Sequence, residues 1–226
     1  MKITFLGTGA ADWPIEKSEN MTEFRRLSSA LIDDTLLIDP GPQIFNALNA
    51  YGKDPKNIKY IINTHKHFDH FCAETVSGLE AAGAKFFALL GGDVKTIGDY
   101  TICAYNANHS TCQNTIHFMI TDGERTLFYG LDGAWLLYDE VQAIKEYKPD
   151  FAVFDATIGD VDGDYRIFEH NNLNMVLEMK KSLENYIGKF CISHMARTLH
   201  TDHKTLSKKM KQCNIITAYD GLEIEI

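Results

Sequence analysis

The sequence predicts an α/β protein, and three features of the 226-residue chain lead to that prediction. Short apolar runs rich in β-branched residues, such as 58–63, have the length and composition of buried strands. Between such runs lie longer segments with apolar residues at helical spacing, such as 72–82 and 134–147. No proline-, glycine- or serine-rich linker divides the chain, so we expect one domain over residues 1–226.

Turn signals between the apolar runs predict how neighbouring strands pair. Asp34-Thr35 lies between two short runs, and Asp122-Gly123 is a strong hairpin signal because such pairs readily adopt positive φ angles. Asp220-Gly221 has the same composition, so the last two strands are also predicted to pair with each other. The predicted strands are 2–6, 29–33, 36–39, 58–63, 85–90, 100–105, 114–121, 124–130, 151–155, 190–193, 215–219 and 222–226, and the predicted helices are 43–50, 72–82, 134–147, one that begins at 170, and 201–212.

The overall charge argues against long nucleic acid as a partner. The formal net charge is −9 and the pI is near 5.4. Proteins that hold polyanions usually carry a basic stripe, whereas the short cluster of Lys208, Lys209 and Lys211 is typical of a solvated helix face. We therefore expect a small-molecule substrate.

The cysteines and the apolar segments indicate the compartment. Five cysteines are scattered along the chain without a Cys-x-x-Cys pair, which argues against a disulfide framework or a cysteine-based zinc site. The apolar run at the N-terminus is too short for a signal peptide, and no segment approaches membrane-spanning length. These features predict a cytoplasmic protein that does not bind a membrane.

Segment 64–71 reads Thr-His-Lys-His-Phe-Asp-His-Phe and lies between a predicted strand and a predicted helix. His65 and His67 are two residues apart in extended chain, so they project to the same side and can share one cation. Asp69 and His70 follow at once and can reach a second cation. Imidazole and carboxylate without thiolate suit zinc, manganese(II) or iron(II). The alternative is that these side chains are solvated and cap the helix.

This His-x-His-x-Asp-His pattern resembles the signature of the metallo-β-lactamase superfamily, and the resemblance extends over nearly the whole chain. It implies a four-layer αββα sandwich and further ligands at the ends of later strands. Asp39 would support the ligands without binding metal. The implied set is His65, His67 and His109 for one metal and Asp69, His70 and His194 for the other, with Asp132 bridging the two.

Two divalent ions about 3.5–4 Å apart can share a water molecule and convert it to hydroxide, which attacks a carbonyl carbon or a phosphorus. A leaving alkoxide then needs a proton, and His170 is the candidate donor. At a helix N-terminus beside two cations its imidazolium is disfavoured, so we expect a neutral donor until an anionic substrate arrives. The alternative is that His170 only caps the helix.

Segments 170–177, 191–194 and 220–224 resemble the cyclic phosphodiesterase family of the carbon–phosphorus lyase (phosphonate) pathway. In that family the histidine matching His170 works on the phosphoryl group. The family also carries a structural zinc, held by cysteines and a histidine. Here the loop 10–27 has no cysteine and Arg197 replaces the histidine, so that zinc is not expected and the substrate stays open.

The sequence thus predicts a dinuclear hydrolase of small, including cyclic, phosphodiesters. Arg197 and His200, on the loop after the last ligand, are expected to bind the substrate phosphate. The same metals would also serve a lactonase or thioesterase. A transfer-RNA 3′-processing nuclease would need a basic RNA-binding arm, and a di-iron redox protein would need a flavin partner domain. The sequence shows neither feature. The identity of the metals and the oligomeric state, a homodimer included, are left open.

Overall fold

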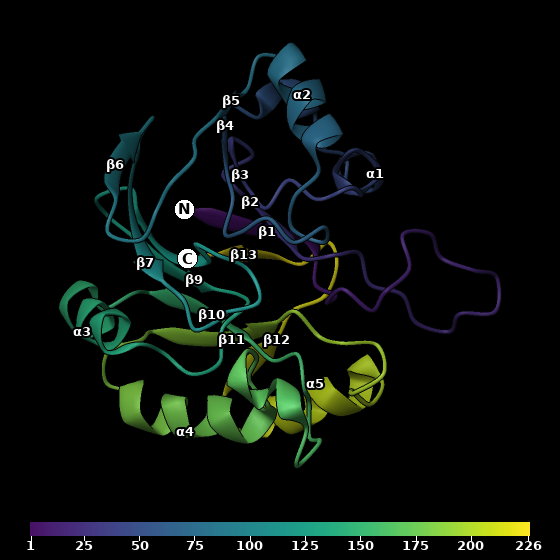
Figure 1. Ribbon diagram of the computed structural model, residues 1–226, viewed down its shortest axis with the longest axis vertical. Coiled ribbons are helices and arrows are strands. Elements are labelled where there is room, and N and C mark those ends of the chain that lie inside the picture. The colour runs from purple at the N-terminus through teal and green to yellow at the C-terminus, as the bar shows by residue number, and fades with distance from the viewer.

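The computed structural model describes residues 1–226 and shows two β-sheets packed face to face between two layers of helices (Figure 1). The first sheet contains, in spatial order, β13 (Glu223–Glu225), β1 (Lys2–Gly7), β2 (Ser29–Ile32), β3 (Leu36–Ile38), β4 (Tyr60–Ile62) and β5 (Lys85–Phe86). The second contains β12 (Ile215–Thr217), β11 (Lys189–Ser193), β10 (Phe151–Asp155), β9 (Thr126–Gly130), β8 (Ile116–Thr121), β7 (Tyr100–Asn106) and β6 (Val94–Ile97).

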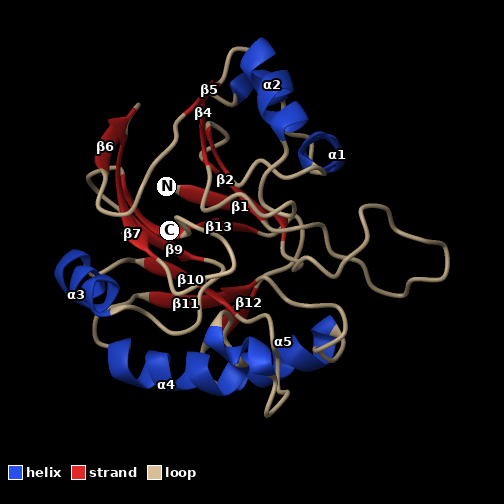
Figure 2. Ribbon diagram, viewed as in Figure 1, coloured by secondary structure: helices blue, strands red, loops and turns tan.

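Five α-helices form the two outer layers, so the αββα sandwich is confirmed (Figure 2). The outer face of the first sheet packs against α1 (Ile44–Ala50) and α2 (Ala73–Ala81). The outer face of the second packs against α3 (Tyr138–Tyr147), α4 (Leu173–Leu183) and α5 (His203–Gln212). Short 3₁₀ turns cover Pro55–Asn57 and Tyr165–Phe168.

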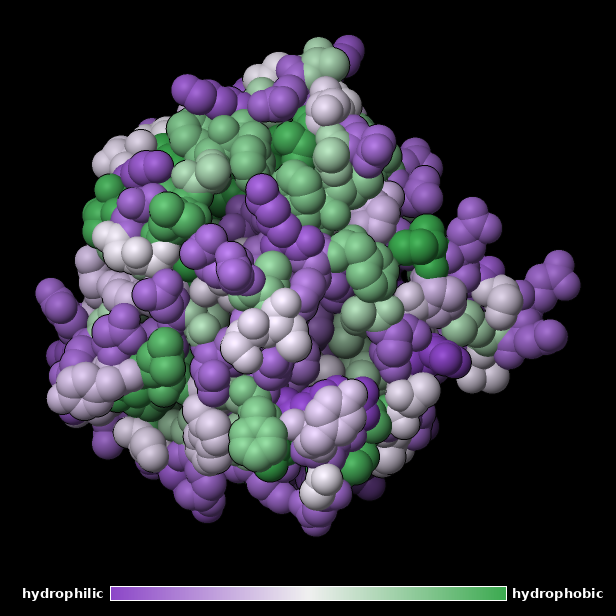
Figure 3. All heavy atoms as spheres, in the orientation of Figure 1, coloured by the Kyte–Doolittle hydropathy of each residue, from purple (hydrophilic) through white to green (hydrophobic).

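Buried side chains alternate between the layers because successive residues of a strand face opposite sides. In β10, Phe151 and Val153 pack between the sheets, whereas Ala152 and Phe154 pack beneath the helices. Near-continuous burial of such strands is what the apolar runs in the sequence predicted. Outside, hydrophilic side chains cover most of the face shown in Figure 3, with hydrophobic ones gathered near β5 and α2. None of the helices is long and apolar enough to cross a bilayer.

The predicted pairing of the last two strands is wrong. β12 runs parallel to β11, with Ile192 opposite Thr217, whereas β13 runs antiparallel to β1 in the other sheet. The chain crosses between the sheets at Asp220. Its carboxylate accepts hydrogen bonds from Thr8 Oγ1 at 2.7 Å and from the backbone N–H of Arg26 at 2.5 Å. An Asp-Gly pair that a hairpin would use thus serves a long-range contact here.

Parallel pairing brings several strand ends to the site. β3 and β4 are parallel in the first sheet, and β9, β10 and β11 are parallel in the second. Each of these five strands is followed directly, or within a few residues, by polar side chains. Since carboxyl ends of parallel strands meet at one edge, residues distant in sequence converge there.

Candidate metal centre

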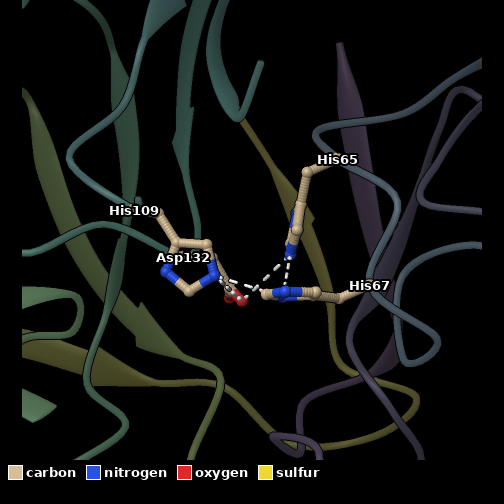
Figure 4. Close-up of side chains that lie close together, drawn as sticks. All are labelled: His65, His67, His109 and Asp132. Carbon is tan, nitrogen blue, oxygen red and sulfur yellow. Dashed lines mark hydrogen bonds and ion pairs between the residues drawn. The ribbon is translucent and has the colours of Figure 1, made fainter. Parts of the chain in front are cut away.

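The first group of possible ligands consists of His65, His67, His109 and Asp132 (Figure 4). Nδ1 of His67 lies 3.0 Å from Nε2 of His65 and 3.2 Å from Nε2 of His109. Oδ2 of Asp132 lies 3.4 Å from Nε2 of His65 and 3.8 Å from that of His109. Three imidazole nitrogens and one carboxylate oxygen therefore face a common point.

The second group consists of Asp69, His70, Asp132 and His194, all buried. The two Nε2 atoms of His70 and His194 are 3.2 Å apart. Oδ2 of Asp69 lies 3.5 Å from each of them. Oδ1 of Asp132 lies 3.3 Å from Nε2 of His70 and 2.9 Å from that of His194.

Asp132 belongs to both groups and presents a different oxygen to each. Its Oδ1 is buried without a hydrogen-bond partner, and a buried polar atom left unpaired in a native fold requires an explanation. Tetrahedral zinc with Zn–N bonds near 2.0–2.1 Å places its ligands roughly 3.3 Å apart, similar to the separations in both groups. The donor set and its spacing thus fit two divalent cations.

Backbone conformation directs three of the buried side chains into the site. Asp39 follows β3, Asp132 lies just beyond β9 and His194 follows β11, and all three have φ near +60°. That left-handed region is unfavourable for residues other than glycine, and such strain concentrates at functional sites. The turn after each strand sends the side chain back toward the strand ends.

Asp39 holds the second group from behind, as predicted. Its Oδ2 lies 2.8 Å from Nδ1 of His70, and its Oδ1 accepts hydrogen bonds from the backbone N–H and Oγ1 of Thr64. A proton on Nδ1 of His70 satisfies this carboxylate, which leaves Nε2 unprotonated toward Asp132. Asp39 therefore fixes both the orientation and the tautomer of His70.

Asp155 is a second buried carboxylate at the site, and it contacts two histidines directly or through Thr157. Its Oδ2 lies 2.7 Å from Nδ1 of His170 and 3.1 Å from Oγ1 of Thr157. The same Oγ1 lies 2.7 Å from Nδ1 of His194. When Thr157 donates to Asp155, it accepts the Nδ1 proton of His194 and leaves Nε2 of that histidine free for a cation.

The two groups differ in electrostatics. Burial lowers the pKa of His65, and it lowers the pKa of His109 to about 4. Burial also opposes the charged form of His70 and His194, but neighbouring carboxylates outweigh it. The largest of these contributions comes from Asp132. The carboxylates together raise the pKa of His70 well above its usual value and the pKa of His194 to about 10.

His170 does not cap a helix, and a buried carboxylate that the sequence did not indicate lies beside it. Asn172 is the cap of α4, since its side-chain oxygen accepts a hydrogen bond from the N–H of Met175 at 2.9 Å. Burial opposes the charged form of His170, but the adjacent Asp155 carboxylate outweighs burial and raises its pKa. The helix begins beyond the histidine, and the prediction missed Asp155.

A cavity of about 320 Å³ opens onto both groups. Side chains of His67, His109, His170 and His194 line it, together with Arg166. Volumes of this order hold small ligands.

Arg197 and His200 do not line this cavity, so their predicted place beside the metals is corrected. They line a neighbouring cavity of about 540 Å³. Nε and the backbone N–H of Arg197 donate to Asp12, and Nε2 of His200 lies 2.6 Å from the carbonyl oxygen of Ala156. Asp12 itself lines the metal-site cavity, so Arg197 lies behind a residue of that lining and not in the lining.

We compared the chain with known protein families and solved structures. Residues 27–73 match the family described as the metallo-beta-lactamase superfamily. No curated protein matches the chain. The metallo-β-lactamase fold protein YhfI from Bacillus subtilis covers 100% of this chain and 99% of its own, with 18% identity and a TM-score of 0.75. The chain has the metallo-β-lactamase fold.

Two further solved structures share the fold over their whole length. Zinc-bound PqqB from Methylobacterium extorquens has a TM-score of 0.75 at 16% identity, with 100% of both chains covered. A new diphosphatase from the PhnP family has a TM-score of 0.72 at 16% identity, covering 100% of this chain and 97% of its own.

Sequence reasoning missed three polar residues of the site: Asp155, Thr157 and Arg166. Asp155 ends a predicted buried strand, and Asp132, which the resemblance supplied, also lies at the end of a predicted strand. Applying that criterion, an aspartate at a strand end, to β10 would have found Asp155. Arg166 lies in the 3₁₀ turn before His170, where no periodicity marks it.

Proposed function

We propose that the chain is a dinuclear metal-dependent hydrolase that acts on small phosphodiesters. The observation that carries this proposal is Asp132, whose two oxygens face two separate sets of histidines. A carboxylate in this position bridges two cations. The fold supports the proposal, because the solved PqqB structure of the same fold is zinc-bound.

The first cation would be held by His65, His67 and His109 and the second by Asp69, His70 and His194, with Asp132 shared. Two divalent cations in such a site polarise the scissile bond and activate a water molecule at neutral pH. Asp39 and Asp155 keep the Nε2 atoms of the second group unprotonated and aimed inward. Burial excludes bulk water and strengthens these interactions.

His170 is suited to protonate the leaving group. Its ring lies between the two groups, stacked on His194 at 5.6 Å and edge-on to His109 at 4.9 Å between centroids. Because Nδ1 donates to Asp155, Nε2 is the atom available to a substrate in the cavity. After giving up the Nε2 proton, the neutral ring keeps the tautomer that Asp155 holds.

Two observations favour phosphodiesters over carboxylic esters. A positioned proton donor assists an alkoxide that leaves phosphorus, and one structure of this fold is a diphosphatase. The small cavity and the net charge of −9 favour a small substrate over a long polyanion. A lactonase or thioesterase remains the competing proposal, since the same cations would polarise a carbonyl. Cytoplasmic location and a homodimer stay predictions.

The test is a substrate panel on protein loaded with Zn²⁺ or Mn²⁺. Bis(p-nitrophenyl) phosphate and a small cyclic phosphodiester should be hydrolysed, with p-nitrophenyl phosphate and β-lactams turned over much less. Emission spectrometry should find about two metals per chain. Lactone hydrolysis that far exceeds phosphodiester hydrolysis would favour the lactonase, and no more than one bound metal would rule out the dinuclear site.

A further inference from the structure

Four apolar residues contribute to the lining of the metal-site cavity, and only one of them has a large ring. Phe68, between His67 and Asp69, lines the cavity although its side chain is 60% exposed. The other apolar residues of the lining are alanines at 10, 11 and 196. The phenyl ring is thus the one extended apolar group of the lining. The ring is therefore an accessible apolar plane in the lining of the cavity.

Arg166 supplies a second planar group to the same cavity. Its Nε and Nη2 donate to Asp164 at 2.8 and 2.6 Å, and its guanidinium lies 5.8 Å from the ring centroid of Tyr165. The plane of the guanidinium is therefore fixed, and Nη1 takes no part in the pair with Asp164. Because Asp164 balances the charge, Arg166 acts here as a planar donor more than as a free cation.

We infer that the metal-site cavity binds, next to the reacting phosphate, a planar aromatic ring such as a nucleobase, which stacks on Phe68, with Arg166 as a second planar group in the same lining. The inference rests on the proposed phosphodiesterase and specifies its substrate as a nucleoside phosphodiester of about one nucleotide. Aromatic rings and guanidinium planes are groups on which proteins stack bases. An aliphatic substituent could not stack on Phe68 or on Arg166. A second phosphate would gain little from Arg166, because its charge is already paired with Asp164.

Other exposed rings do not compete for this assignment. Tyr165 and Phe168 are 79% and 74% exposed, but neither lines the cavity. Phe45 is 41% exposed on α1 and lies against Gly78 of α2, in the outer helical layer. Phe45 therefore serves as the matched control for loss of an exposed phenyl group.

The experiment compares two substrates with the same reacting group and the same leaving group. Methyl p-nitrophenyl phosphate and thymidine 5′-(p-nitrophenyl phosphate) differ only in a methyl group against a nucleoside. The wild-type protein should prefer the nucleoside ester in kcat/KM, mainly through a lower KM. Phe68→Ala should reduce that preference about tenfold, as expected for the loss of one stacking partner, and Phe68→Trp should restore it. Phe45→Ala should leave it unchanged.

The ratio of the two rates cancels any general loss of activity in a variant. An undiminished preference in Phe68→Ala, or an equal reduction in Phe45→Ala, would overturn the inference. Binding gives a readout independent of catalysis. Calorimetry on the metal-loaded protein should show thymidine 5′-phosphate binding about tenfold tighter than methyl phosphate, with the difference lost in Phe68→Ala. If no diester is hydrolysed but this difference is seen, the proposed reaction fails and the aromatic subsite stands; equal affinities refute the subsite.

Discussion

The two groups of metal ligands share Asp132 but are supported in different ways. In the group of Asp69, His70 and His194, a buried carboxylate stands behind each histidine, Asp39 directly and Asp155 through Thr157. In the group of His65, His67 and His109 the carboxylates are less direct. Asp39 reaches His65 only through Thr64, and the partly exposed Glu169 carboxylate lies 3.6 Å from Nδ1 of His109. Nδ1 of His65 lies 3.0 Å from Oγ1 of Thr64, and Nδ1 of His109 lies 3.2 Å from the carbonyl oxygen of Glu169.

A carboxylate behind a ligating histidine fixes its tautomer and makes it a stronger base, so it binds metal more tightly. Exposure differs in the same direction, since His67 is half-buried whereas His70 and His194 are buried. The comparison teaches that the cation of the second group (Asp69, His70 and His194) would be held firmly, whereas the cation of the first group (His65, His67 and His109) would exchange more readily. Stepwise addition of a chelator should therefore remove the cation of the first group first.

The largest effect is expected where the two groups meet. Asp132→Ala removes the only residue common to both, so both metals should be lost and phosphodiester hydrolysis should fall to background. Emission spectrometry and rate measurements check this, with Asp93→Ala in the loop before β6 as a control that should retain both metals. Full occupancy in Asp132→Ala would show that this carboxylate is not shared.

His170 belongs to neither group, and this predicts a second outcome. His170→Ala should keep both metals yet lose about 10²–10⁴ in rate, the usual contribution of a positioned proton donor. An alkoxide leaving group needs that proton and should suffer most, whereas p-nitrophenolate should suffer least. Asn172→Ala is the matched control, because loss of the α4 cap should cost about 1 kcal/mol of stability with every substrate affected alike. Equal losses on both leaving groups in His170→Ala would remove it from the mechanism.

Much of the fold could be predicted from the sequence because local patterns determine it. Apolar runs gave the buried strands, and Asp122-Gly123 marked a real hairpin between β8 and β9. Asp220-Gly221 led to a wrong prediction of a hairpin. The chain crosses between the sheets there, and the Asp220 carboxylate bonds Thr8 and Arg26. Strand β6 was missed because Val94, Lys95 and Thr96 are exposed at a sheet edge and show no apolar pattern.

The sequence predicted the site residues that are adjacent in the chain. It did not predict contacts between residues that are distant in the chain and close only in the fold. Segment 64–71 carries its chemistry in adjacent residues, and resemblance supplied His109, Asp132 and His194. Asp155 and Thr157 lie on a different strand end from His170 and His194, so only the fold shows that they touch. Arg197 and His200 were predicted from their nearness in sequence to His194, but neither lines the metal-site cavity, and they bond Asp12 and the backbone of Ala156.

A third variant tests whether carboxylates make the second group the tighter one. In Asp39→Asn, one amide oxygen can still accept from Thr64, and asparagine tolerates the φ of +60°. The amide NH₂ would then face Nδ1 of His70 and move its proton to Nε2, toward Asp132. Metal affinity of this group should fall about 10- to 100-fold while the other group is unaffected. Cobalt(II) titration followed by absorption spectra measures the two affinities separately.

The control for that change is Asp33→Asn, because Asp33 also has a positive φ and accepts hydrogen bonds from Lys2 and Tyr100, remote from the metals. It should leave both cobalt affinities unchanged. Equal weakening of both groups by Asp39→Asn would contradict the comparison, because it would make the contact of Asp39 with His65 through Thr64 as important as its direct contact with His70.

The smallest effect is expected in the first group, at Glu169. Its carboxylate accepts hydrogen bonds from Ser110 Oγ at 3.0 Å and from Thr111 Oγ1, and so holds the loop that carries His109. These bonds are largely exposed to solvent, where a lost hydrogen bond costs on the order of 1 kcal/mol. Glu169→Ala should weaken cobalt binding to the first group by less than about tenfold and leave the second unchanged. Glu169→Gln keeps an acceptor for the loop and should bind as the wild type does. A larger loss in Glu169→Ala than in Asp39→Asn would reverse the comparison, because it would make the solvent-exposed loop, and not the buried carboxylates, the main determinant of metal affinity.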